Sequence, residues 1–276
     1  MTESPQSQPP LSHSLLILVP AYNEEERIEP TLRSFATYFT NHFQDNFQIV
    51  AVLNGCTDGT AEVVARVAQD HPSVACLDFP GRIGKGGALI EGLKLAPRAE
   101  IIGYIDADGA TAPEAFHDLV TKLPGHDCVI GSRWLDGAIL HQEQTNKRQL
   151  ASRVFNAVIR MLFGMPYHDT QCGAKVLTKE AVEQVHDSLT IADMAFDINL
   201  LYGLKRAKLK VLETPTEWTD KLGTKVKLGR TSLVMLLSAI RLRLVYSPFY
   251  KFLRPLRPIE AWVYKSLSAP PPRSRH

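Results

Sequence analysis

The chain has 276 residues, of which 45% are hydrophobic and 22% are charged, so it can bury a large core and is not an intrinsically disordered protein. Its four cysteines lack metal-site spacing, which argues against a zinc module or a disulfide framework and favours a reducing cytoplasm. The net charge is +2 overall but +10 from Thr219 to His276, where twelve Lys and Arg face only Asp220 and Glu260. This uneven distribution indicates an anionic partner surface or a solvated tail.

The first half of the chain alternates between strand and helix patterns. Apolar runs predict strands at 14–19, 47–53, 74–79 and 101–105. Helical patterns cover 24–39, 60–68 and 86–95, and a fourth helix is predicted to open with Thr111 as its N-cap and Pro113 just behind it. Repeated strand–helix units predict an α/β fold, a mostly parallel sheet covered by helices on both faces.

The second half is less regular. It predicts strands at 128–130, 174–177 and 210–214, and helices at 146–163, 194–205 and 231–245. We divide the chain into a disordered tail at 1–13, a catalytic domain at 14–230 and a basic, amphipathic helical extension at 231–276. The first fourteen residues read as a tail, because they have neither the basic start nor the apolar stretch of a signal peptide.

Two carboxylates, Asp106 and Asp108, follow the fourth predicted strand, with Ala107 between them. Ligands of parallel sheets bind outside the carboxyl ends of the strands. A divalent cation that also binds phosphate oxygens suits such a pair, and it can neutralise a leaving diphosphate. An Asp-x-Asp pair alone is weak evidence, so its meaning depends on the neighbouring loops.

The loops after the first three strands can each bind a ligand. Tyr22 and Glu24 could hold a nucleoside, or they belong to a proline turn and an acidic first helical turn. The Gly- and Asp-rich loop at 54–60 allows close backbone approach, or it is an ordinary helix entry. Three glycines around Lys85 could present N–H groups and one positive charge to a diphosphate, or they form a flexible turn.

Further charged residues lie in the second half. Arg133 ends a strand and Arg153 falls in the next helix, and arginine forks suit phosphate oxygens. Asp197 lies among apolar neighbours, where an acid is either a helix-surface residue or a working group. The convergence of four ligand-competent strand ends, in order, favours a single binding site.

These segments resemble the family 2 glycosyltransferases of the GT-A fold. The matching motifs lie at 19–24, 54–60, 84–87, 106–108 and 131–133. Segments 106–111, 169–173 and 195–202 are similar to the dolichyl- and polyprenyl-phosphate sugar synthases, especially the dolichyl-phosphate β-glucosyltransferases. Asn54 departs from the family, which commonly has an Asp pair at this strand end. The N-terminal membrane anchor of the eukaryotic glucosyltransferases is also not visible.

The resemblance implies a set of site residues. Donor binding falls on Pro20, Ala21, Tyr22, Glu24, Asn54, Lys85, Asp106, Ala107 and Asp108. Asp106 and Asp108 would hold the divalent cation, Mg²⁺ or Mn²⁺. The catalytic residues would be Asp197, Asp108 and Arg133. The acceptor phosphate would meet Arg133, Arg153 and Lys225.

The expected function is an inverting transfer of a hexose from a nucleotide sugar, UDP-glucose before GDP-mannose, to a polyprenyl or dolichyl phosphate. One alternative is a soluble family member that glycosylates a hydroxyl of a small molecule or glycan. Another is a non-catalytic nucleotide-sugar-binding or membrane-adaptor protein. A phosphate acceptor is already an anion near neutral pH and needs no strong base, whereas a hydroxyl acceptor would need Asp197 as the base.

An apolar stripe in the last predicted helix includes Leu233, Leu236, Leu237, Ile240 and Leu244, with Arg241 and Arg243 off it. This pattern suits a helix that lies on an anionic membrane, and the alternative is a helix packed on the domain or in a homodimer. We expect a cytoplasmic protein, peripheral on the cytoplasmic face of a membrane, with no nucleic-acid partner.

Overall fold

The computed structural model describes residues 13–141, 146–219 and 228–246. The expected tail up to residue 12, Lys225 and the C-terminal segment from 247 lie outside these residues. The strands are β1 His13–Ala21, β2 Phe47–Asn54, β3 Val74–Phe79, β4 Ala99–Tyr104, β5 Cys128–Ser132, β6 Ile139–Leu140, β7 Lys175–Thr178, β8 Val211–Pro215 and β9 Glu217–Trp218. The α-helices are α1 Ile28–Phe43, α2 Thr60–Asp70, α3 Gly84–Leu93, α4 Pro113–Thr121, α5 Asn146–Phe163, α6 Lys179–Val185, α7 Phe196–Arg206 and α8 Leu228–Val245.

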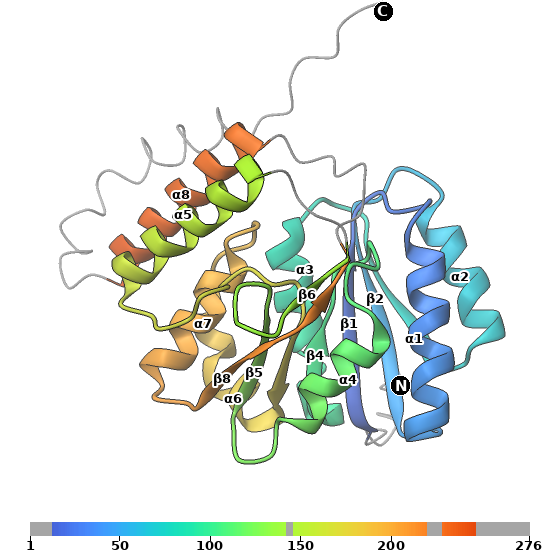
Figure 1. The fold of residues 1–276 in the computed structure, drawn as a ribbon. Helices are drawn as coiled ribbons and strands as arrows, with labels where there is room; N and C mark the ends of the chain where they lie inside the picture. The colour runs from blue at the N-terminus through green and yellow to red at the C-terminus, as the bar shows by residue number, and fades with distance from the viewer. Residues whose placement is uncertain (1–12, 142–145, 220–227, 247–276) are drawn as a thin grey trace, which may run out of the picture.

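Seven strands form one sheet in the order β3-β2-β1-β4-β7-β5-β8, and β6 and β9 form a small parallel pair (Figure 1). The first four strands of this order are parallel, as the sequence predicts. The strand β7 is antiparallel to both β4 and β5. Because β7 runs backwards, the loop that precedes it reaches the same edge of the sheet as the loops that follow β4 and β5.

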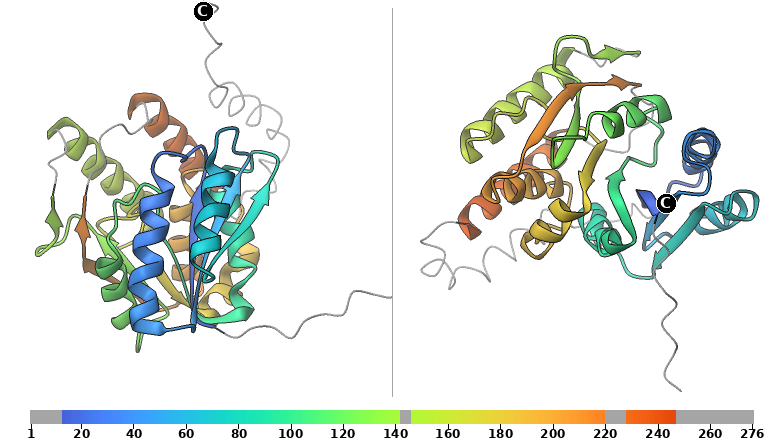
Figure 2. Two further views of the ribbon diagram at one scale, coloured as in Figure 1. Left: turned by 90° about the vertical axis from the view of Figure 1, so that its right-hand side faces the viewer. Right: turned by 90° about the horizontal axis from the view of Figure 1, so that it is seen from below.

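Helices cover both faces of the sheet, which explains why the central strands are apolar at almost every position. In β1, Leu16 and Leu18 join one core cluster, and Leu15, Ile17 and Val19 join the other. Figures 1 and 2 show α1, α2 and α4 on one face and α3, α6 and α7 on the other. The sheet is therefore held between two helical layers, with its polar loops free at the carboxyl edge.

The helix α8 packs onto the body of the protein beside α5 and α7. Its Ala239 and Leu242 are fully buried in the core that includes α7. Tyr246, just after the helix, donates its hydroxyl to the Ser188 carbonyl at 2.9 Å. In the described part of the chain, no helix combines the length and apolarity needed to cross a bilayer.

One predicted helix start is wrong. Ala112, not Thr111, is the N-cap of α4, and no side chain caps this helix. Pro113 does occupy the start of α4, where its missing N–H costs nothing. Thr111 is buried instead, and its hydroxyl has no hydrogen-bond partner in the described structure. Its side chain faces the protein interior beside the carboxyl edge of the sheet, so it does not cap the first turn of α4.

Candidate active site

The carboxyl ends of β1, β2 and β4 lie next to one another. Ala21 pairs with Leu53, and Leu18 pairs with Tyr104, so the loops that follow these strands leave the same edge. Pro20 and Ala21 are buried at the end of β1. The sheet therefore brings together the loops at 22–25, 54–60 and 105–111, as the sequence predicts.

The loop after β1 offers an exposed aromatic surface. Tyr22 is 37% exposed, and the Arg82 guanidinium lies over its ring at 4.3 Å from the centroid. The Glu24 carboxylate forms two short hydrogen bonds with Arg27, at 2.6 and 2.7 Å. The Glu24 N–H donates to Thr60 Oγ1 at 2.9 Å, which ties this loop to the one after β2. The sequence did not identify Arg27 and Arg82 as part of the site, because their contacts with Glu24 and Tyr22 depend on the folded conformation of the loops.

The Asn54 side chain is buried and supports the lysine loop. Its Oδ1 accepts hydrogen bonds from the N–H groups of Ile83 and Gly84, at 2.6 and 2.9 Å. Gly84 has a φ of +81°, and a Cβ there would lie 2.1 Å from the Ala192 carbonyl oxygen, so only glycine fits. Asn54 therefore fixes the start of α3 and with it the position of Lys85.

Lys85 and Asp106 form an ion pair with Nζ and Oδ1 2.5 Å apart. Burial alone would lower the pKa of Lys85, but the nearby carboxylates, with Asp106 first among them, raise it above its usual range. A Cβ on Gly173 would lie 2.1 Å from Asp106 Oδ2, so the loop before β7 lies directly against this carboxylate. Lys85 thus stays cationic at the end of β4.

Asp108 lies on the same turn as Asp106. Burial and the charge of Asp106 raise the pKa of Asp108, although its Oδ1 accepts a hydrogen bond from the Ala110 N–H at 3.1 Å. Ala107 between them is buried, and its carbonyl accepts a hydrogen bond from Thr31. Among the described residues, no group of three or more His, Cys, Asp or Glu is arranged to hold a metal ion. The two carboxylates therefore form at most part of a cation site.

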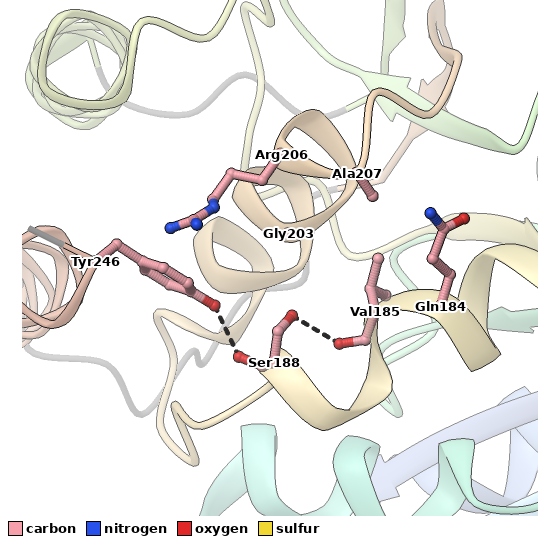
Figure 3. Close-up of a pocket in the computed structure, with 7 residues that line it drawn as sticks. All are labelled: Gln184, Val185, Ser188, Gly203, Arg206, Ala207 and Tyr246. Atoms are coloured by element: carbon pink, nitrogen blue, oxygen red, sulfur yellow. Dashed lines mark hydrogen bonds between the residues drawn. The ribbon is translucent and has the colours of Figure 1, made fainter.

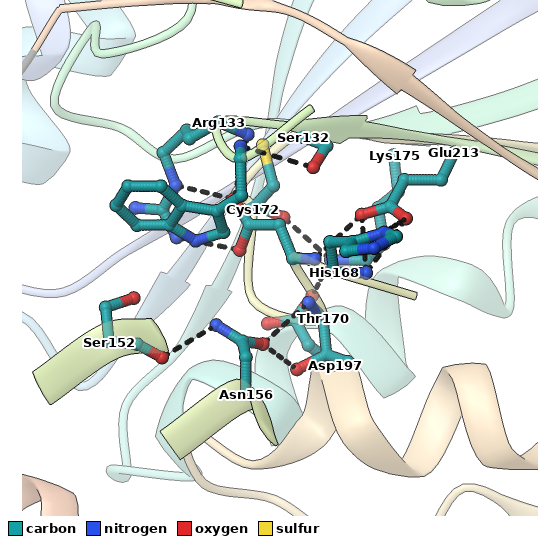
Figure 4. A network of polar contacts seen from close by, with 12 residues as sticks. Ser132, Arg133, Ser152, Asn156, His168, Thr170, Cys172, Lys175, Asp197 and Glu213 are labelled. Carbon is teal, nitrogen blue, oxygen red and sulfur yellow. Dashed lines mark hydrogen bonds and ion pairs between the residues drawn. The ribbon is translucent and has the colours of Figure 1, made fainter. Parts of the chain in front are cut away.

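Asp197 is buried in a polar network within the core (Figure 4). Its Oδ1 lies 2.5 Å from Lys175 Nζ and accepts the Tyr104 hydroxyl at 2.6 Å. Lys175 is fully buried and also donates to the Cys172 carbonyl at 2.7 Å. Burial favours the neutral acid, but Lys175 and Lys85 together with these hydrogen bonds lower the pKa of Asp197. Asp197 is therefore an ionised carboxylate whose Oδ1 is paired with Lys175 and Tyr104.

Arg133 forms a second buried ion pair, with Asp169. Its Nε and one terminal nitrogen donate to the two carboxylate oxygens at 2.7 and 2.9 Å. The guanidinium also lies 5.6 and 5.1 Å from the ring centroids of Trp134 and Trp218. Burial would raise the pKa of Asp169, but the adjacent Arg133 lowers it. Only the remaining N–H groups of Arg133 can reach a ligand.

Helix α5 extends this second group. The exposed Arg153 lies 5.1 Å from the Trp134 ring centroid. On the inner side of the helix, Asn156 Oδ1 accepts the N–H and the hydroxyl of Thr170 at 2.9 and 2.8 Å (Figure 4). Arg133 and Arg153 therefore flank one indole, whereas Lys225 lies outside the described residues.

Four buried polar atoms near Arg133 have no hydrogen-bond partner in the part of the chain that the structure describes. They are Thr111 Oγ1, Trp134 Nε1, Thr216 Oγ1 and Trp218 Nε1. The backbone joins their segments, since the Thr219 N–H donates to the Ala110 carbonyl and the Thr216 N–H to the Ser132 carbonyl. An unpaired buried polar group costs about 1–3 kcal/mol, so these atoms are candidates to meet a polar ligand.

A hollow of about 250 Å³ lies elsewhere, between α6, α7 and the end of α8 (Figure 3). It is lined by Gln184, Val185, Ser188, Gly203, Arg206, Ala207 and Tyr246. None of the strand-end residues lines it, and no carboxylate among the described residues does so. The candidate active site is therefore the carboxyl edge of the sheet, despite this hollow.

An α/β sheet with a lysine, an Asp-x-Asp pair and an arginine group at its carboxyl edge is the arrangement expected of a nucleotide-dependent transferase. The family model described as glycosyl transferase family 2 matches residues 16–185. The chain belongs to this family.

Its relatives include glycosyltransferase AglD of Haloferax volcanii, which is 31% identical over 79% of this chain and 35% of that protein. The dolichyl-phosphate β-glucosyltransferase of Dictyostelium discoideum is 30% identical over 84% of this chain and 74% of that protein. The chain spans about a third of AglD and 66% of the dolichyl-phosphate β-glucosyltransferase ALG5C of Trichomonas vaginalis.

A crystal structure of glucosyl-3-phosphoglycerate synthase from Mycobacterium tuberculosis matches with a TM-score of 0.61 and 18% identity, over 83% of this chain and 80% of that one. This match establishes the GT-A fold. The expected fold and family are thus confirmed.

Proposed function

We propose that this protein transfers a hexose from a nucleotide sugar to a polyprenyl or dolichyl phosphate, with inversion at the anomeric carbon. UDP-glucose is the first candidate donor and GDP-mannose the second. Several relatives are named dolichyl-phosphate β-glucosyltransferases, including those of Dictyostelium discoideum and Homo sapiens. We place the enzyme peripherally on the cytoplasmic face of a membrane, where a lipid phosphate is accessible.

The state of Asp197 is the observation that carries this proposal. A hydroxyl acceptor needs a base with a free lone pair and a pKa near neutrality. Oδ1 of Asp197 is instead occupied by Lys175 and Tyr104, and the lowered pKa makes this carboxylate a weak base. A phosphate monoester is already an anion, since its second pKa is about 6. The site therefore suits an acceptor that brings its own charge, and Asp197 acts as a fixed counter-charge that positions Lys175.

The donor would occupy the strand ends. Tyr22, with Arg82 behind it, offers an aromatic platform for the nucleoside beside Pro20 and Ala21. Lys85 is held cationic and would contact the diphosphate. Asn54 would act indirectly, because its Oδ1 holds the loop that carries Lys85.

Asp106 and Asp108 fit a divalent cation, Mg²⁺ or Mn²⁺. Burial and the charge of Asp106 raise the pKa of Asp108, and a bound cation would offset this repulsion between the carboxylates. The remaining ligands would come from donor phosphate oxygens and water, because two carboxylates do not complete a site. When bound, such a cation neutralises charge on the leaving diphosphate. The related synthase from Mycobacterium tuberculosis was crystallised with Mn²⁺ and UDP.

The acceptor phosphate would meet the arginine group. Arg133 is locked by Asp169, so it presents its free N–H groups in one orientation without further ordering. Arg153 adds a second, exposed positive charge on α5, and Lys225 is the third candidate. The unpaired indole and hydroxyl groups near Arg133 are suited to the hydroxyls of the transferred sugar.

A donor panel tests this function. UDP-glucose, GDP-mannose and other nucleotide sugars are incubated with a polyprenyl phosphate or with the corresponding prenol, and both nucleotide release and lipid product are followed. We expect product only with the phosphate. Transfer to the prenol that is abolished in Asp197→Asn would instead support the hydroxyl-acceptor alternative. Donor binding without any transfer would support a non-catalytic protein.

A further inference from the structure

The outer faces of α5 and α8 are apolar. Eight large hydrophobic side chains are exposed among the described residues, and five of them lie on these two helices. These five are Leu150, Val154, Met161, Ile240 and Leu244, with exposed fractions of 64, 54, 82, 40 and 43%. Apart from them, the exposed hydrophobics are scattered singly over other elements, as is normal for a protein surface.

The spacing places these side chains in stripes along the helices. Leu150, Val154 and Met161 are separated by four and seven residues, so they share one face of α5, and the exposed Ala157 lies between them. Ile240 and Leu244 are four apart and share one face of α8. The opposite sides of the helices are buried, through Asn156 and Ile159 on α5 and Ala239 and Leu242 on α8.

The two helices lie side by side on the outside of the molecule, as Figures 1 and 2 agree. Arg243 Nε of α8 donates to the Leu162 carbonyl of α5 at 3.2 Å, which fixes their contact. In Figure 1 the pair stands at the level of the carboxyl ends of the parallel strands. The apolar stripes are therefore carried by a fixed helix pair near the candidate active site.

The charge of this helix pair has one sign. Neither helix sequence contains an Asp or Glu. Together the two sequences hold Lys147, Arg148, Arg153, Arg160, Arg230, Arg241 and Arg243. An apolar stripe with basic flanks is the pattern of a helix that lies in the interface of an anionic bilayer. A second copy of the chain would bring the same positive charge to a two-fold contact, which disfavours self-association.

We propose that α5 and α8 form the surface by which this protein lies on an anionic membrane. This inference rests on the proposed function, because it gives the lipid acceptor a route to the site. The inner side of α5 holds the loop with Asp169 through Asn156, and Arg153 flanks Trp134 beside Arg133. A lipid phosphate at the bilayer surface would therefore meet the arginine group while its tail stays among the lipids.

Flotation with vesicles tests the surface. The full chain is mixed with vesicles of phosphatidylcholine alone or with about a third phosphatidylserine. The variants are Val154→Gln/Met161→Gln on α5 and Ile240→Gln/Leu244→Gln on α8. The matched control is Ala65→Gln, an exposed apolar residue on α2. Thermal unfolding and circular dichroism confirm that each variant is folded.

We expect the wild type and Ala65→Gln to float with the anionic vesicles, and each double variant to float at least about fivefold less. Equal flotation of wild type and variants, or none by the wild type, would overturn the proposal. A concentration-dependent dimer lost in the same variants, without vesicle binding, would also overturn it and make this face a homodimer contact.

An assay with a water-soluble, short-chain prenyl phosphate as acceptor distinguishes a failure of the membrane surface from a failure of the proposed function. With this acceptor the double variants should keep wild-type transfer, and with acceptor embedded in vesicles they should lose at least about fivefold. If no prenyl phosphate accepts sugar from the wild type, the proposed function fails whatever the flotation result. If the wild type transfers sugar to a prenyl phosphate but the double variants float as well as the wild type, only the proposed membrane surface is wrong.

Discussion

Lys175 and Asp197 meet with Nζ and Oδ1 2.5 Å apart, although neither side chain is more than 4% exposed. Lys175 comes from β7 and Asp197 from the first turn of α7, so the pair joins the middle of the sheet to the helix layer. Buried charges of this kind are tolerated only when each one is matched. The Tyr104 hydroxyl and the Cys172 carbonyl complete the hydrogen bonding of the pair.

Lys175→Met should destabilise the protein by about 3–5 kcal/mol, because it leaves Asp197 as an unpaired buried charge. The free energy of unfolding from urea titration measures this loss. Lys94→Met is the control, since Lys94 pairs with Glu91 on the surface and should cost less than about 0.5 kcal/mol. Similar losses in both variants would contradict the buried-charge account.

Stability should fall in acid through Asp169 and Asp197. The pKa of each is lower in the folded protein than the usual value of about 3.9, so the stabilisation is complete above that value and is lost as the pH falls through the folded pKa. Urea midpoints should therefore drop below about pH 4. Asp197→Asn should flatten this dependence, and an unchanged acid slope would argue against the lowered pKa.

Gly173→Ala should reduce transfer by about 100-fold while the protein stays folded. The new Cβ would lie 2.1 Å from Asp106 Oδ2 and push the carboxylate away from Lys85. Steady-state kinetics and thermal unfolding measure the two effects separately. Gly81→Ala is the matched control, because a Cβ there meets nothing within 4 Å. An unaffected Gly173→Ala enzyme would show that the position of Asp106 is unimportant.

Asp108→Asn should lower transfer by about 100-fold without loss of stability at pH 7. Burial and Asp106 disfavour the ionised form of Asp108, so a neutral amide of the same shape removes a repulsion. Chelation of divalent cations should abolish transfer by the wild type, and Mg²⁺ or Mn²⁺ should restore it. Full activity in excess chelator would rule out the cation, and Glu62→Gln on α2 serves as the control variant.

The alternating half of the chain was predictable because its signals are local. Apolar runs and turn residues locate β1 to β4, and a parallel sheet then places Lys85 and Asp106 at one edge. Thr111 misled the prediction, since a threonine before a helical proline resembles a cap and only the tertiary fold buries it. The small strands β6 and β9 are two residues long and carry too little periodicity to be read.

The partners of Asp197 were not predictable, because they depend on long-range pairing. Lys175 opens an apolar strand, where a lysine ordinarily points to solvent. Tyr104 lies 93 residues from Asp197 and reads as one more apolar residue of its strand. Asn54 looked like a ligand-binding amide, but its oxygen holds the loop around Gly84. Sequence periodicity predicts the face of the strand or helix on which a residue lies, but not the distant residue that its side chain contacts.

The reversed strand β7 couples the two charged groups of the site to each other. Lys175 pairs with Tyr104 on one side and with Ile130 on the other, and its side chain reaches Asp197 of α7. Gly173, two residues before Lys175, lies against Asp106. A change that shifts β7 would therefore disturb the Asp106 carboxylate and the Lys175–Asp197 pair together. One strand of four residues thus sets the positions of both carboxylates.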